Sequence, residues 1–177
     1  MSTTESILQQ TSKWLELGND LLNRMLEKAG GVEQTCILLA RGLLGLFFIF
    51  FALDKLAAYS DTAIYMSAFG VAGILLPGVI LIELLAGTAL LVGWQTRKAA
   101  VSLAGFTILA ALIFHSDFTE PVQTILFMKN MAIAGGLLLF VAVGAGQHSL
   151  DAHSIELLKK SKVKTKARTR AKPKSKN

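Results

Sequence analysis

The sequence predicts an all-α integral membrane protein, in which a four-helix bundle follows an N-terminal amphipathic surface helix and precedes a disordered basic C-terminal tail. Four apolar runs between residues 35 and 146 indicate the bundle, and 53% of the 177 residues are hydrophobic. About 20 apolar residues cross a bilayer as a helix, so each run approaches the length of one span. Three charged residues lie inside these runs and predict a shared polar interior, namely Arg41, Glu83 and Lys129.

Residues 1–34 read as a separate amphipathic segment. From Ile7 to Leu26 the apolar side chains recur in steps of three and four, which is typical of a helix with one apolar face. The pair Gly30-Gly31 is expected to end this helix. Its length and mixed charges favour a helix on the cytoplasmic membrane surface, and the alternative is a helix that binds a partner protein.

The membrane domain is expected over residues 35–146. Its spans are predicted near residues 35–56, 74–94, 99–114 and 121–144, with proline in the first turn of the second and at the start of the fourth. A short helix over residues 61–69, capped by Ser60 and closed by Gly70, is expected between the first two spans. The loop at residues 95–98 is short, so the second and third spans are antiparallel neighbours.

One face of the first span is too polar to contact lipid. Arg41, Gly45, Phe48, Ala52 and Lys55 follow helical spacing and combine two cations with two small residues. Small residues allow a neighbouring helix to approach closely. This face is therefore expected to pack against another span.

The intramembrane charges predict a polar pocket formed by Arg41, Glu83, Lys129 and Asn130. At 1.5 Å per residue, Glu83 and Lys129 both lie about 12–14 Å below the outer surface, and Arg41 about 7 Å deeper. Glu83 is expected to accept from Arg41, Lys129 or both, because an unpaired charge in lipid is costly. The same charges have two interpretations, a purely structural set that fixes helix register and a pocket for a small polar or amphipathic ligand such as a quinone headgroup.

Three further polar residues are expected near the outer face. Asp54 and Lys55 end the first span, and His115 ends the third. Together with Lys129 and Asn130 they form a candidate polar funnel that leads from the outer surface toward Glu83.

The charge distribution sets the expected orientation. Residues 159–177 hold ten Lys or Arg and no acid, which leaves 8 basic and 12 acidic residues, a net charge of −4, in the rest of the chain. Basic residues also occupy the 95–98 loop, whereas the connectors at 57–73 and 115–124 have none. The positive-inside rule then places both termini in the cytoplasm. Residues 147–177 are expected to form a basic cytoplasmic tail, disordered from Val163 onward, that binds anionic inner-leaflet lipid without specificity for nucleic acid.

The residue types argue against several classes of active site. A single cysteine excludes an intrachain disulfide, a dithiol relay and iron–sulfur or zinc sites. The three histidines lie at opposite ends of the expected bundle, so no two can ligate one haem iron. No phosphate-binding loop or nucleophile elbow occurs. The expectation is therefore no catalytic residue, no metal and no intrinsic cofactor.

Several segments resemble one known family. ARGLLGLFFIFFALDKLAAY, LLPGVILIELLAGTALLVGWQTRKAA, FHSDF and FMKNMAIAGGLLL are similar to the DoxX family of small four-helix bacterial membrane proteins, over about Leu38 to Asp151. The family is named after a subunit of an archaeal quinone-reducing sulfur oxidoreductase. The matched polar residues include Arg41, Lys55, Glu83, Arg97, His115, Lys129 and Asn130. The resemblance implies a bacterial inner-membrane location and a link to membrane redox complexes.

The favoured function is an accessory, non-catalytic membrane subunit of a quinone-linked redox system, with a bound quinone near Glu83. Its expected partners are an oxidoreductase subunit or a cytosolic protein, and an oligomer is compatible with the sequence. Two alternatives remain open. The first is a carrier of small solutes or lipids that uses the same polar interior, and the second is a membrane scaffold that recruits cytosolic partners through residues 1–34.

Overall fold

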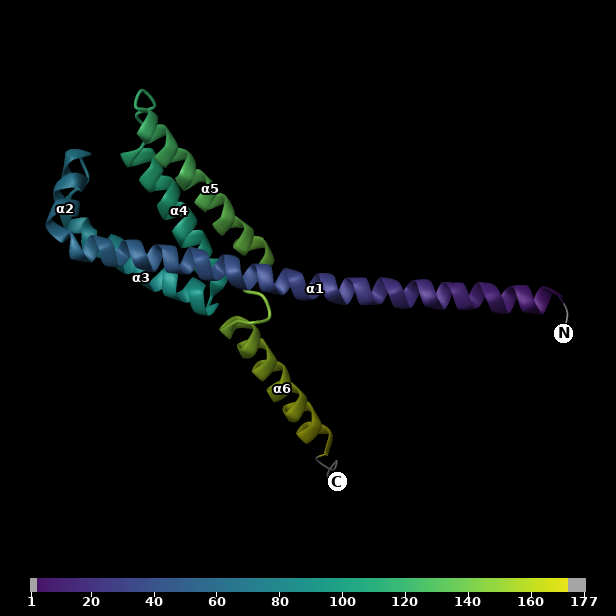
Figure 1. Cartoon of the computed structure of the whole chain (residues 1–177). Coiled ribbons are helices and arrows are strands. Elements are labelled where there is room, and N and C mark those ends of the chain that lie inside the picture. Colours follow the sequence, from purple (N-terminus) through teal and green to yellow (C-terminus); the bar gives the residue numbers. More distant parts are fainter. Residues whose placement is uncertain (1–2, 172–177) are drawn as a thin grey trace, which may run out of the picture. The chain divides into compact units, whose positions relative to one another are not determined.

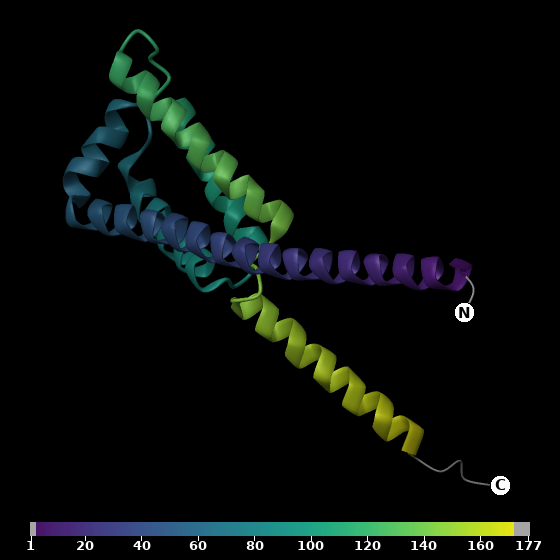
Figure 2. The same ribbon diagram turned by 45° about the vertical axis from the view of Figure 1, so that its right-hand side comes forward.

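The computed structural model describes the backbone of residues 3–171, and the exposure of side chains at residues 13–25, 27 and 30–163. All regular structure in this range is helical (Figures 1 and 2). The elements in chain order are α1 (Thr3–Ala57), α2 (Tyr59–Ala68), the 3-10 turn η1 (Gly73–Leu75), α3 (Leu76–Val92), α4 (Thr96–Phe114), α5 (Pro121–Val143) and α6 (Leu150–Ala171).

Four helical segments are long and apolar enough to cross a membrane, at Lys13–Ala57, Gly73–Val92, Thr96–Phe114 and Pro121–Val143. They coincide with the four spans predicted from the apolar runs, so the expected all-α membrane bundle is confirmed. The first segment differs most from its prediction, because its helix begins far before residue 35. The third span begins at Thr96 rather than Ala99.

The described part of the chain divides into two compact units, residues 1–37 and residues 38–177. The first unit contains only the N-terminal part of α1. Its apolar side chains include Trp14, Leu21 and Met25, each more than 60% exposed, and an exposed ion pair joins Arg24 to Asp20 at 2.9 Å. The unit is therefore a single helix, and these described apolar side chains are left open on its surface.

The predicted helix end at Gly30-Gly31 was wrong. The helix runs without a break from Thr3 to Ala57, and an added Cβ at either glycine would meet no atom within 4 Å. A mid-helix glycine costs only about 1 kcal/mol relative to alanine. Good helix formers on both sides of the pair offset that cost, and no left-handed residue or proline is present to end the helix.

Within the second unit, residues 38–57 of α1 lie beside α3, and α4 and α5 form an antiparallel pair (Figures 1 and 2). The expected packing face of the first span is buried. Gly45, Phe48 and Ala52 are buried on it, and the backbones of α1 and α3 meet at Gly45 and Gly87. A Cβ at Gly45 would lie 2.9 Å from the Gly87 carbonyl oxygen. Glycine at both positions thus permits the close approach.

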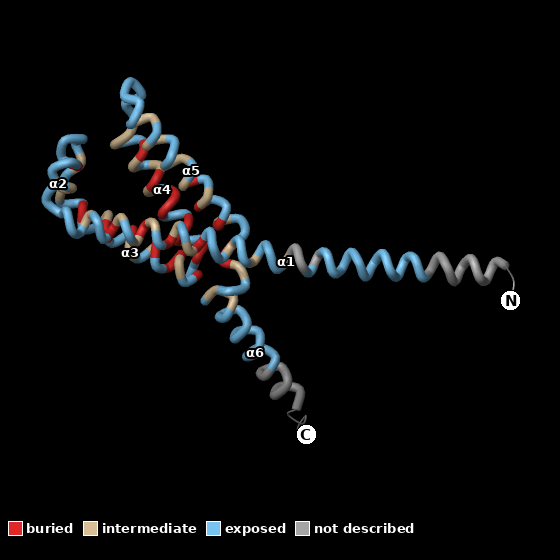
Figure 3. The backbone as a smooth tube through the Cα atoms, viewed as in Figure 1, coloured by how far each residue is buried: buried red, intermediate tan, exposed pale blue. Residues whose placement is uncertain are grey.

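Buried residues gather where α1, α3 and α4 approach one another (Figure 3). Their fully buried members alternate large and small side chains, which fills the space between helices. They include Leu76, Leu90, Ala100, Leu103, Ala111 and Leu137. The outward surface is also apolar, as a membrane span requires, because Leu43, Phe50, Leu85, Leu109 and Leu139 are each more than 50% exposed.

Local turn chemistry fixes the helix ends. Pro77 stands in the first turn of α3, where its missing N–H is not needed. Gly93 ends this helix with φ +74°, and the next amide, of Trp94, donates to the Ala89 carbonyl at 2.8 Å. The expected connector helix is present, but it begins at Tyr59 and no side chain caps it, so the proposed Ser60 cap was wrong. Gly70 follows its end with φ +75°.

The predicted disorder of the basic tail was also wrong over part of its length. Residues Leu150–Ala171 form α6, while residues 172–177 lie outside the described range. Lysine, arginine and alanine are strong helix formers, and Pro173, the residue least compatible with a helix interior, comes only after α6. An ion pair at 2.6 Å between Lys160 and Glu156 links successive turns, and it lowers the pKa of the Glu156 carboxyl.

Gly45→Ala is expected to lower the free energy of unfolding by about 1–3 kcal/mol, because the added methyl group forces α1 away from α3. Gly42→Ala, on the same helix, is the matched control. A Cβ at Gly42 meets no atom within 4 Å, so this change should stabilise by about 0.5–1 kcal/mol. Equilibrium unfolding in detergent micelles measures both. Equal effects of the two substitutions would contradict the close contact between the helices.

Candidate functional site

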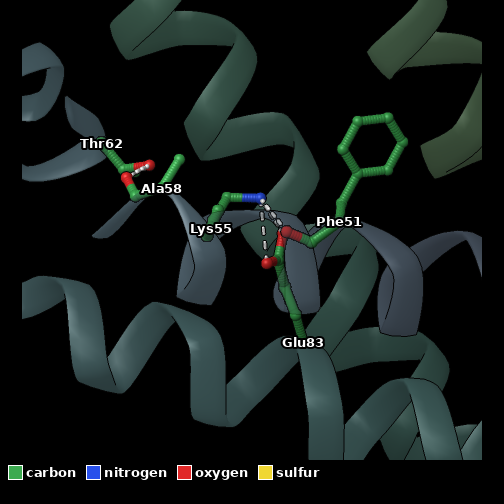
Figure 4. A network of polar contacts seen from close by, with 5 residues as sticks. All are labelled: Phe51, Lys55, Ala58, Thr62 and Glu83. Atoms are coloured by element: carbon green, nitrogen blue, oxygen red, sulfur yellow. Dashed lines mark hydrogen bonds and ion pairs between the residues drawn. The ribbon is translucent and has the colours of Figure 1, made fainter. Parts of the chain in front are cut away.

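The most buried acid of the membrane domain pairs with a cation from another helix. The Lys55 ammonium on α1 lies 3.0 Å from each carboxylate oxygen of Glu83 on α3, as Figure 4 shows. The Glu83 side chain is 4% exposed and that of Lys55 25%. Lys55 also donates to the Phe51 carbonyl at 3.4 Å. The pair therefore joins two spans at the level where α1 approaches its end at Ala57.

This arrangement differs from the expected pairing of Glu83 with Arg41 or Lys129. Arg41 and Lys55 share a helix face, but 14 residues separate them, about 21 Å along α1. Glu83 lies near the Lys55 level, which is too far from Arg41 for a side chain to bridge. The sequence estimate of depth assumed upright helices and placed Arg41 too close to Glu83.

Arg41 belongs instead to a buried cluster at the opposite end of the bundle. Its guanidinium donates to the backbone carbonyls of Ala145 and His148, the latter at 2.6 Å. Arg41 is 2% exposed, and it packs so tightly on the turn after α3 that a Cβ at Gly93 would lie 2.5 Å from its Nη1. Arg41 thus ties α1 to the segment that connects α5 with α6.

Asp151, which the sequence analysis did not identify as a site residue, completes this cluster. Its two carboxylate oxygens accept from the backbone amides of Gln95 at 2.7 Å and Thr96 at 2.9 Å. It therefore caps the N-terminus of α4 from α6, as an acid at an N-cap does within one helix. Its own amide donates to the Gly93 carbonyl at 2.9 Å.

A cavity of about 310 Å³ lies beside the Lys55–Glu83 pair. Five helices contribute to its wall, and the wall is mostly aromatic and aliphatic. Its phenylalanines are Phe47, Phe48, Phe51, Phe106 and Phe114. The polar members of the wall are Lys55, Thr62, Tyr65, Glu83, Thr107, His115, Lys129 and Asn130.

The cavity brings together some of the expected site residues and omits others. Glu83, Lys129 and Asn130 of the predicted pocket line it, and so do Lys55 and His115 of the predicted outer group. His115 Nδ1 forms a hydrogen bond with Gln123 Oε1 at 2.8 Å. Arg41 lies outside the cavity, in the cluster with Asp151. Asp54 is exposed and is also outside the cavity wall.

Two buried oxygens in the cavity wall have unmet hydrogen-bonding capacity. Thr107 is 4% exposed, and its hydroxyl has no hydrogen-bond partner. Glu83 Oε2 lies in ionic contact with Lys55 but lacks a hydrogen bond of good geometry. An unmet buried polar group is costly, so both oxygens favour a ligand or water in the cavity. Sequence analysis did not identify Thr107, because a lone threonine in an apolar span forms no recognisable motif.

Aromatic rings surround the end of the cavity nearest α2. Tyr65 on α2 stacks on Phe114 at a centroid distance of 5.6 Å and lies 4.9 Å from the Phe69 ring. Burial raises the pKa of the Tyr65 phenol above its usual value, so this group stays neutral and can donate at neutral pH. The connector helix α2 therefore forms part of the wall.

The described residues offer no metal centre, because no three of their His, Cys, Asp and Glu side chains come together as a ligand group. The polar groups of the cavity can bind hydrogen-bonding atoms of an organic head, and its phenyl groups can bind an apolar ring or chain.

Replacing one member of the ion pair is expected to destabilise the bundle more than replacing both. Glu83→Leu or Lys55→Met alone leaves a charge unpaired and should cost about 3–5 kcal/mol. The double variant should regain most of this loss, because two apolar residues then face each other. Unfolding in detergent of the wild type, both single variants and the double variant measures the coupling. Additive losses would contradict a direct pair.

Comparison with known proteins identifies the family of this chain. The family model described as DoxX matches residues 36–116. The Inner membrane protein YqjF of Escherichia coli (strain K12) is 45% identical over 120 residues, 68% of this chain and 92% of the relative. The Inner membrane protein YphA of the same organism is 32% identical over 130 residues, 69% of this chain and 92% of the relative. No solved structure matches. With four helices suited to cross a bilayer, this chain is a multi-pass inner-membrane protein of the DoxX family.

Proposed function

We propose that this protein is an accessory subunit of a membrane redox system and binds a quinone-type molecule in the cavity beside Glu83. One observation carries the proposal. A cavity of about 310 Å³ has a wall of phenyl groups and, at the same place, a buried ion pair and an unpartnered Thr107 hydroxyl. The volume lies at the lower end of the range for small-molecule sites.

The polar groups suit the two ends of a quinone ring. A quinone carbonyl accepts hydrogen bonds, and Thr107 and Lys55 are donors in the wall. The ring can lie against phenylalanine faces, as aromatic pairs do. No residue of the described chain has a covalent or redox role in this proposal. The protein binds and positions the quinone, and a partner oxidoreductase supplies the electron transfer.

Two other functions can be separated from this one by experiment. A carrier of small solutes or lipids would use the same cavity and would move its ligand across the bilayer, so uptake into proteoliposomes separates it from a binding subunit. A scaffold would use the exposed apolar side chains of the first unit, such as Trp14 and Leu21. Loss of a partner on deletion of residues 1–34, with Glu83 dispensable, would favour the scaffold.

The proposal includes an orientation with both termini in the cytoplasm. The 95–98 loop carries two basic residues, and α6 with the residues after it carries ten, while the connectors at 57–73 and 115–124 have none. The basic side chains after Leu158 then lie near the inner leaflet, where each attracts anionic lipid by about 1 kcal/mol.

Thr107→Val is expected to weaken quinone binding about fivefold, since a lost hydrogen bond is worth about 1 kcal/mol. Thr88→Val is the matched control, because Thr88 is exposed on α3 and outside the cavity wall. Isothermal titration of a short-chain naphthoquinone into protein in lipid nanodiscs measures both constants. Absence of quinone binding by the wild type would refute the function, and an equal effect of the two variants would remove Thr107 from the site.

Single-cysteine labelling tests the orientation. In a Cys36→Ala background, a cysteine at Ser116 should react with a membrane-impermeant maleimide added to intact spheroplasts, and a cysteine at Ser161 should react only after lysis. Both positions are exposed in the structure, so access to the reagent depends on the side of the membrane. The reverse pattern would overturn the orientation.

A further inference from the structure

The described wall of the cavity carries two lysine ammonium groups and one carboxylate. Glu83 is the carboxylate of the cavity wall, and both its oxygens contact Lys55. Lys129 also lines the cavity. Its ammonium forms no ion pair with any described residue, and its one described contact is with the Phe51 ring, 6.0 Å from the centroid. The side-chain charges of the wall thus sum to +1 with His115 neutral.

Phe51 brings the two cations to the same part of the cavity. The Lys55 ammonium lies 5.7 Å from the centroid of the ring that Lys129 also approaches. A phenyl face attracts a cation only weakly at an exposed site. That attraction does not replace a carboxylate, and the one carboxylate of the described wall, Glu83, pairs with Lys55 and leaves Lys129 without an anionic partner.

Lys129 occupies a depth at which an unpaired charge is costly. It lies eight residues into α5, about 12 Å from the start of that helix. Its side chain is exposed within the span, where an unpaired charge is costly. Asn130 follows it in the wall and is neutral. An anion brought by a ligand would pair this ammonium, whereas a neutral head would leave the charge unmet.

The unpartnered Thr107 hydroxyl is a second, independent observation. It favours a ligand whose polar headgroup carries hydrogen-bond acceptors. It is buried to more than nine-tenths, lines the same cavity and has no acceptor among the described residues. An anionic oxygen accepts from a hydroxyl and from an ammonium at once, with stronger hydrogen bonds than a neutral oxygen. The phenylalanine wall at the same time requires an apolar body.

We propose that the cavity is selective for an amphipathic organic anion, and that Lys129 is the residue that selects its charged head. The inference deepens the proposed function, because it specifies the charge of the molecule bound at that site. A quinone-type ligand would then be held in an anionic form, such as a ring with an ionised hydroxyl, in preference to its neutral form. Lys55 remains the partner of Glu83, and Thr107 donates to the same head.

Matched pairs of probes test the charge selection. The first pair is 2-hydroxy-1,4-naphthoquinone, an anion at pH 8, and its neutral 2-methoxy counterpart. The second pair is decanoate and decanol, which lack the quinone ring. Binding to the full chain in nanodiscs is measured for the wild type, Lys129→Met, Lys129→Arg and Lys98→Met. The last variant removes the same charge from an exposed position outside this cavity.

The wild type is expected to prefer each anion over its neutral counterpart by about tenfold or more, the scale of a hydrogen bond to a charged group. Lys129→Met should abolish this preference, because the anion should then bind no more tightly than its neutral counterpart. Lys129→Arg should retain it, and so should Lys98→Met. Retained binding of the neutral probe also shows that Lys129→Met is folded.

The outcomes separate this inference from the proposed function. Equal binding of both naphthoquinones, or a preference that survives Lys129→Met, overturns the charge selection and leaves quinone binding intact. Binding of decanoate over decanol that depends on Lys129, without binding of either naphthoquinone, supports the selection and overturns the quinone. No preference within either pair overturns the inference. Loss of an oligomer in Lys129→Met with unchanged binding also overturns it, because Lys129 would then pair with a second copy.

Discussion

The contact between Lys55 and Glu83 is the interaction on which the site depends. A membrane span cannot present either charge to lipid, so each must find its partner on another helix. The pairing fixes the rotation of α1 and α3 about their axes, because the lysine and the glutamate must face each other. Once this rotation is set, Gly45 meets Gly87, and Phe47, Phe48 and Phe51 of α1 line the space between the helices. The cavity is a consequence of that arrangement.

A second polar cluster fixes the other end of the bundle by different means. Arg41 uses backbone carbonyls as acceptors, and Asp151 uses backbone amides as donors. The two side chains satisfy exposed backbone groups of the turns that connect the spans, where no helix provides partners. The cluster thus positions the start of α6 against the bundle. It contains no cavity of the aromatic kind, and its role in this account is structural.

The sequence predicts most of the fold, because its strongest signals are physical. The lengths of the apolar runs, with Pro77 and Pro121 in first turns, locate the second, third and fourth spans within a few residues. Two expectations about helix ends and disorder failed because high helix propensity outweighed the signal against a helix. Gly30-Gly31 did not end α1, and residues up to Ala171 formed a helix in place of a disordered tail. In both segments strong helix formers surround the polar or glycine residues.

The site was harder to predict. Residue types identified Glu83, Lys129 and Asn130 in the cavity wall, but the partner of Glu83 depends on the relative height and tilt of α1 and α3. Apolar run lengths do not fix either quantity to within one helical turn. Thr107 and Tyr65 are ordinary in a span and a connector, and only the burial of Thr107 and the position of both in the cavity wall reveal them. Asp151 lies 55 residues from the amide of Thr96 that it caps, a distance over which no local pattern acts.

The most direct test of the central contact is a distance measured in a lipid bilayer. Solid-state NMR recoupling between ¹⁵N-labelled Lys55 Nζ and ¹³C-labelled Glu83 Cδ reports whether the two groups touch. The account predicts strong recoupling, as expected for nitrogen–oxygen contacts of 3.0 Å. Recoupling too weak for direct contact, together with a carboxylate of Glu83 that couples to the guanidinium of Arg41, would contradict it.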